Sequence, residues 1–85
     1  MKQPALKYII VRDGEYEFPV MFANAWAHSD VARKLRGDGQ SVIGAGFVMT
    51  DDGGRVVCSG RSSSLGISSR PERDAAVIRA WLAGT

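Results

Sequence analysis

The chain has 85 residues, 45% hydrophobic and 24% charged, with a formal net charge of +2. These values fit one small folded domain over residues 1–85 and exclude a disordered or two-domain chain. A single cysteine and a single histidine exclude an intrachain disulfide and a zinc site of clustered Cys and His ligands. The chain has no apolar run of the roughly 20 residues that a membrane span needs, and no apolar signal segment. We therefore expect a cytoplasmic protein that carries no metal or cofactor.

The first residues predict a β-hairpin. Residues 6–12 (LKYIIVR) are rich in β-branched and aromatic side chains, which favour a strand. Asp13-Gly14 is a strong hairpin signal, because Gly14 tolerates the positive φ of a tight turn. The return strand covers residues 15–22, and Pro19 within it cannot donate a backbone hydrogen bond. The return strand therefore either lies at an edge of the sheet or ends at Pro19.

The sequence then changes to a helical period. Val31, Ala32 and Leu35 form an apolar stripe at helical spacing. Ser29 is the expected N-cap, and Gly37 is expected to follow the last turn. Together these features predict a helix of about two turns.

A second hairpin follows the helix. Residues 42–50 (VIGAGFVMT) read as a strand that is weakened or bulged at Gly44 and Gly46. Residues 51–54 (DDGG) form the expected turn, and residues 55–59 (RVVCS) form the return strand.

The last third contains an ambiguous segment and a clear helix. Residues 60–69 (GRSSSLGISS) fit either a strand that continues past a bulge or a loop. Ser69 and Glu72 have the spacing of a capping box, which predicts a helix start with Ser69 as N-cap. Four apolar residues then form one stripe that is expected to face the sheet: Ala75, Ile78, Trp81 and Leu82.

The predicted order of elements is ββαββα. This order indicates an α+β domain in which an antiparallel sheet of about four strands packs its apolar face against both helices. The sheet has open edges and the core of so short a chain is small, so we expect a homodimer.

The serine-rich segment and the start of the last helix form the candidate ligand site. Hydroxyls, guanidinium groups and a helix N-terminus are the groups that bind phosphate in proteins. The competing interpretation is a polar connection in which Ser69 caps the helix and Arg70 pairs with Asp74. The candidate residues for binding a small phosphate-bearing ligand are Arg61, Ser62, Ser63, Ser64, Ser69 and Arg70.

Trp26 and His28 are the candidates for binding a partner. Trp26 is either part of the core or an exposed anchor, since tryptophan is frequent in binding hot spots. His28, Ser29 and Asp30 are neighbours in sequence, which does not make a catalytic triad. A hydrolase would need a serine of residues 60–69 to reach His28 across the first helix. We therefore expect no enzymatic activity.

Four strings resemble small proteins of phages and prophages for which no activity is established. They are KYIIV at residues 7–11, HSDVA at 28–32, AGFV at 45–48 and SLGISSRPERDAAVI at 64–78. The resemblance implies an accessory protein of a mobile element, and it implies no catalytic residue. We expect such a protein to bind a host or phage protein, or to sequester a small phosphate-bearing ligand. The alternative is a nucleic-acid-binding module that uses arginines 55, 61, 70 and 73.

Overall fold

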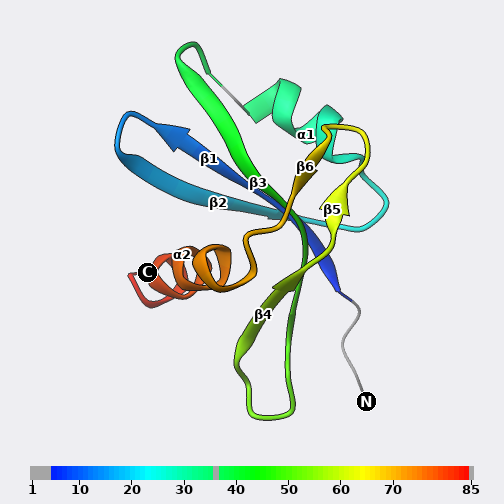
Figure 1. Cartoon of the computed structure of the whole chain (residues 1–85), viewed down its shortest axis with the longest axis vertical. Helices are drawn as coiled ribbons and strands as arrows, with labels where there is room; N and C mark the ends of the chain where they lie inside the picture. Colours follow the sequence, from blue (N-terminus) through cyan, green and yellow to red (C-terminus); the bar gives the residue numbers. More distant parts are fainter. Residues whose placement is uncertain (1–4, 36, 85) are drawn as a thin grey trace.

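The computed structural model describes residues 5–35 and 37–84. Four strands form one antiparallel sheet in the spatial order β2-β1-β3-β4, which leaves β2 and β4 at the edges (Figure 1). The strands are β1 (Leu6–Asp13), β2 (Tyr16–Phe22), β3 (Gln40–Thr50) and β4 (Val56–Ser59). The predicted α+β class and four-stranded antiparallel sheet are confirmed.

Two helices and a small ribbon complete the domain. The helices are α1 (His28–Leu35) and α2 (Pro71–Ala83). The ambiguous segment 60–69 forms neither a long strand nor a plain loop: β5 (Arg61–Ser62) and β6 (Ile67–Ser68) pair as a two-stranded ribbon. With this ribbon included, the predicted order ββαββα is only roughly matched.

The two helices lie on opposite faces of the sheet (Figure 1), so the prediction that both pack on one face is wrong. Successive residues of β1 explain the difference, because neighbours in a strand point to opposite faces. Tyr8 and Ile10 pack in one cluster with Ile78 of α2, whereas Ile9 packs in a second cluster with Val31 of α1. A continuous apolar run is typical of a strand that is buried on both faces.

The first hairpin and its edge position are confirmed. Gly14 has a φ of 63°, and β1 pairs with β2 in a register that places Asp13 opposite Tyr16. The predicted irregularity of β3 is found near Gly44, where the register with β1 shifts between Ile10 and Val11.

Both predicted N-caps are wrong. Helix α2 begins at Pro71 with Arg70 as its N-cap residue, and the hydroxyl of Ser69 lies against Tyr8 instead of capping the helix. Helix α1 begins at His28, one residue before the predicted cap Ser29. The hydroxyl of Ser69 bonds to Tyr8 instead of capping, and Ser29 lies inside the first turn of α1, where its backbone N–H donates to Oγ of Ser64.

Candidate functional site

A buried polar network joins α2 to the sheet. Its five residues, hereafter the Tyr8–Asp74 network, are Tyr8, Glu17, Ser69, Arg70 and Asp74. The hydroxyl of Tyr8 donates to Oδ2 of Asp74 at 2.6 Å and lies 2.6 Å from Oγ of Ser69. Arg70 donates from Nε to Oδ1 of Asp74 and from Nη2 to Oε1 of Glu17, both at 2.9 Å. Asp74 is fully buried, so its carboxylate has no contact with water. The hydrogen bonds from these partners must therefore offset the free-energy cost of desolvating it.

Glycines of β3 make room for this network. A Cβ at Gly44 would lie 2.6 Å from Oδ2 of Asp74, and one at Gly46 would lie 2.4 Å from the carbonyl oxygen of Ser59. These glycines therefore allow the helix start and β4 to approach the sheet closely, which explains residues that interrupt an otherwise good strand.

The environment of the network shifts several pKa values. Burial, together with the hydrogen bond to Asp74, raises the pKa of Tyr8 above its ordinary value. Burial also raises the pKa of the Cys58 thiol to about 11. The hydrogen bond from Arg70 lowers the pKa of Glu17. At neutral pH, Tyr8 is therefore a neutral donor and Glu17 a charged acceptor, while Cys58 is a thiol of low reactivity.

The six predicted ligand-binding residues do not converge on one open site. Ser62 is buried, and its hydroxyl accepts from the Leu65 N–H at 3.1 Å. Ser64 accepts at 3.3 Å from the backbone N–H of Ser29 in the first turn of α1. Ser69 and Arg70 belong to the Tyr8–Asp74 network, as the competing interpretation anticipated for the Arg70–Asp74 pair. Arg61 and Ser63 are exposed, as is Ser64, and the side chains of Arg61 and Ser63 form no hydrogen bond or ion pair with another described residue, although the backbone of Arg61 pairs with Ser68.

His28 is buried and cannot contact a partner in this fold. Its ring stands edge-on to Phe22 and to Phe47, and its Nε2 lies 2.9 Å from the carbonyl oxygen of Gly46. The serine segment does cross over α1, as a hydrolase would require, since Ser64 contacts Ser29 there. The Nε2 atom of His28 is nevertheless held by the Gly46 carbonyl oxygen, and two aromatic side chains flank the ring, so its contacts are structural.

Trp26 is exposed and stands beside an apolar hollow. Its side chain is 52% exposed, so the exposed interpretation is the correct one. Nζ of Lys7 donates to the Trp26 carbonyl oxygen at 2.8 Å, and Nζ of Lys34 lies 5.6 Å from the ring centroid. The hollow, hereafter the Trp26 hollow, has a volume of about 280 Å³. Its main lining residues are Val20, Phe22, Trp26, Asp30, Val31, Lys34 and Leu35.

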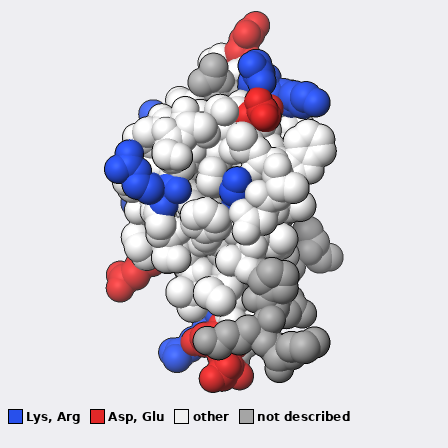
Figure 2. Space-filling model, turned by 90° about the vertical axis from the view of Figure 1, so that its right-hand side faces the viewer, with Lys and Arg blue, Asp and Glu red and all other residues white. Residues whose placement is uncertain are grey.

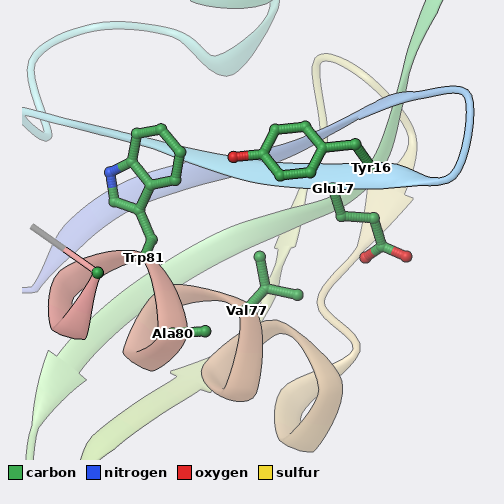
Figure 3. A pocket seen from close by; sticks show the side chains of 6 residues that line it. Tyr16, Glu17, Val77, Ala80 and Trp81 are labelled. Carbon is green, nitrogen blue, oxygen red and sulfur yellow. The ribbon is translucent and has the colours of Figure 1, made fainter.

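A second hollow, which the sequence analysis missed, lies on the α2 side of β2. Trp81 and Tyr16 stand over Val77 and Ala80, as Figure 3 shows, and enclose about 480 Å³. Trp81 is 40% exposed and Tyr16 58% exposed, although the stripe of α2 predicted Trp81 to face the sheet. Phe18 connects the two rings, with centroid distances of 5.9 Å to Tyr16 and 6.3 Å to Trp81. This surface is hereafter the Trp81 hollow.

The helical stripe could not reveal this hollow. Ala75 and Ile78 are buried as predicted, but Leu82 is exposed like Trp81. Trp81 lies beside Phe18 of the edge strand β2, and Leu82 borders a hollow that Leu6, Met21 and Val48 also line, so the last turn of α2 is only partly covered by the sheet.

Basic side chains do not form one continuous patch on the face that carries α1 and the ribbon. Figure 2 shows Lys and Arg there in small groups separated by uncharged surface. Of the four arginines proposed for nucleic-acid binding, Arg55 pairs with Asp51, Arg70 with Asp74 and Glu17, and Arg73 with Glu17. Arg61 forms no ion pair within the described residues.

Residues 5–35 and 37–84 contain no cluster of metal ligands and no helix that could cross a membrane. In this range no three His, Cys, Asp or Glu residues group as ligands for a metal ion. None of the described helices has the length and apolar character to cross a membrane. Comparisons with family models, with curated proteins and with solved structures found no match to this chain.

Proposed function

We propose that the protein is a non-enzymatic accessory protein that binds a protein partner through the Trp26 hollow. The observation that carries this proposal is the half-exposed indole of Trp26, which borders an apolar hollow rather than filling the core. Large aromatic side chains on a firm support are the residues that dominate binding energy at protein interfaces. Contacts from Lys7 and Lys34 hold the segment around Trp26, which lowers the entropy lost on binding.

The lining of the hollow indicates the chemistry of the partner. Val31 of α1, Val20 of β2 and Leu35 provide an apolar floor, and two charged residues lie at its border: Lys34, and Asp30, which pairs with Arg33. A protein that inserts an apolar side chain and carries charged groups beside it fits this surface. The resemblance of the sequence to phage and prophage proteins supports a host or phage protein in the cytoplasm as the partner.

Sequestration of a small phosphate-bearing ligand has less support. Ser62, Ser64 and Ser69 use their hydroxyls inside the fold, and the guanidinium of Arg70 is taken by two carboxylates. Binding of nucleic acid has less support for a similar reason, because acidic residues neutralise three of its four arginines.

The test compares three purified forms: native protein, Trp26→Ala and Arg61→Ala. Candidate host and phage proteins are captured on immobilised native protein, purified, and titrated against each form by calorimetry. We expect Trp26→Ala to weaken binding at least about 30-fold, the scale of a hot spot, and Arg61→Ala to leave it unchanged. Both variants should unfold at the native temperature, since both side chains are exposed.

Salt separates the alternatives. Affinity at an apolar anchor changes little between 50 and 200 mM salt, whereas contacts with several phosphates weaken steeply over that range. A nucleotide or nucleic acid that binds native protein, is lost with Arg61→Ala and is unaffected by Trp26→Ala would overturn the proposal.

A further inference from the structure

The β4 edge of the sheet is open, and it differs from the β2 edge. In the register of β3 with β4, Met49 lies opposite Val57 and Phe47 opposite Ser59. The N–H of Asp51 donates to the carbonyl of Arg55, which marks that pair as hydrogen-bonded. Hydrogen-bonded pairs alternate along an antiparallel ladder, so Val57 and Ser59 face β3 with their backbone groups.

The backbone groups of Val56 and Cys58 consequently point away from β3 toward the open side. At the other edge, Pro19 of β2 removes a donor and blunts the strand against pairing. Strand β4 has no proline, and no described residue pairs with its outer side. Its outer side therefore offers donors and acceptors in the right alternation for one more strand.

One flank of α2 faces the same open side. A groove of about 400 Å³ runs between this flank and β4, and Glu72, Ala75 and Arg79 line it from the helix. Glu72 and Arg79 are two turns apart, so they project in the same direction. Neither side chain forms an ion pair with another described residue.

We propose that a second copy of this chain pairs through its own β4 in an antiparallel arrangement, with a twofold axis at Val57. Directly opposite residues in a sheet point to the same face, so the axis must pass through a residue and not between two residues. Centred on Val57, the pairing sets Val56 opposite Cys58 of the second copy. The outward backbone groups then meet their complements. Val57, 39% exposed in one chain, is covered by its own equivalent.

The charges on α2 favour a second copy as the occupant. A twofold axis makes the two α2 helices run in opposite directions along the joined groove, which brings Glu72 of one copy toward Arg79 of the other. Two such ion pairs then form, one on each side of the axis. A segment of one charge sign would satisfy one of the two residues and repel the other, so the observed pair is self-complementary.

A cysteine placed on the axis tests the register. Residues opposite each other in a non-hydrogen-bonded pair have Cα atoms about 4.5 Å apart, which lies within the range of a disulfide. We expect Val57→Cys to form a covalent dimer in mild oxidant. Ser59→Cys, exposed on the same face, is the matched control. Its two copies would lie roughly 13 Å apart and should not crosslink. Native Cys58 is buried and present in both variants.

Charge reversal tests the helix contact, and sedimentation gives the mass. Native protein should sediment at twice its 9.2 kDa chain mass at tens of micromolar. Glu72→Arg and Arg79→Glu should each weaken the dimer about tenfold, and the combined variant should restore it to within about threefold.

Three results would overturn the inference. The first is a monomeric mass for native protein up to 200 µM. The second is crosslinking of Ser59→Cys as fast as that of Val57→Cys. The third is a combined charge variant weaker than either single variant.

Discussion

The two faces of the sheet hold their helices in different ways. On one face, α2 has 13 residues and is attached by Ile78 and by the Tyr8–Asp74 network, in which a fully buried carboxylate meets several donors. On the other face, α1 has eight residues and is held by Val31 and Ala32, with Ser64 of the ribbon accepting an N–H from its first turn. The α2 face is therefore specified mainly by a buried ionic network, and the α1 face mainly by apolar burial, with one buried hydrogen bond between His28 and Gly46.

This difference teaches where sequence changes will be tolerated. A buried charge has few acceptable positions, so the Tyr8–Asp74 network defines where α2 begins on the sheet. A helix as short as α1 is marginal by itself and depends on neighbours for its stability. We expect the α2 face to be sensitive to single atoms and the α1 face to be tolerant.

Removing Asp74 should have the largest effect. Asp74→Ala leaves the Tyr8 hydroxyl and part of the Arg70 guanidinium without their buried acceptor. We expect the free energy of unfolding in urea to fall by about 3–5 kcal/mol, the cost of breaking a buried ion pair. Asp52→Ala in the exposed β3–β4 turn is the control and should change it by less than about 0.5 kcal/mol. A loss below 1 kcal/mol for Asp74→Ala would contradict the role given to this network.

Filling the space at Gly44 should have the next largest effect. The new methyl group of Gly44→Ala would meet Asp74 at 2.6 Å, so we expect a loss of about 1–3 kcal/mol in urea unfolding. Gly53→Ala is the control, because its Cβ would come no closer than 3.4 Å to Asp51. In the Asp74→Ala background the same Gly44→Ala change should cost less, since the two residues share one space. If the two losses of stability were fully additive, residues 44 and 74 would not share one space.

Tyr8→Phe should cost about 1–2 kcal/mol at neutral pH, because Asp74 and Ser69 lose a hydroxyl partner. The variant also has a pH signature. Burial raises the pKa of Tyr8, so above about pH 10 the unfolded chain releases this proton while the folded chain keeps it. Stability therefore falls as the pH rises, by about 1.4 kcal/mol per unit from this group.

The dependence of the free energy of unfolding on alkaline pH distinguishes the contribution of Tyr8 from that of Cys58. Cys58, whose pKa burial raises to about 11, adds a similar fall that begins at lower pH and ends near its folded pKa. Tyr8→Phe should leave only the Cys58 fall in urea unfolding measured from pH 8 to 11, so stability should fall less steeply above about pH 10 than in the native protein. An unchanged slope in the variant would mean that Tyr8 is not held in its neutral form.

The smallest effect is expected on the α1 face. Ser64→Ala removes the acceptor of the Ser29 N–H, and we expect a loss of at most about 1 kcal/mol, as for a helix cap. Ser63→Ala, one residue earlier and exposed, should have no measurable effect. If Ser64→Ala destabilised the protein as much as Tyr8→Phe, the proposed contrast between the two faces would be wrong.

Local patterns in the sequence predicted the elements well, and long-range contacts explain the errors. The hairpin at Gly14 and the edge position of Pro19 depend on backbone geometry within a few residues, and both are confirmed. The predicted cap at Ser69 failed because its hydroxyl bonds to a residue 61 positions away, and Ser29 lies inside the first turn of α1, where its backbone N–H donates to Oγ of Ser64. A capping pattern cannot exclude a competing partner that only folding brings close.

The candidate site shows the same division. The sequence analysis singled out Trp26 as core or anchor, and the structure exposes it beside a hollow. The Trp81 hollow was missed because helical periodicity does not show how much of the last turn of α2 the sheet covers. Four of the six predicted ligand-binding residues turned out to be occupied by contacts inside the fold.

The sequence by itself determined the α+β class, the hairpins and the final helix, because apolar periodicity and turn chemistry act over a few residues. Tertiary structure alone decided that the helices lie on opposite faces, since a strand buried on both sides looks like one apolar run. It also decided which polar residues are free. Asp74 and Ser62 look like surface residues in the sequence, yet both are buried, because their partners supply the hydrogen bonds that water would otherwise provide.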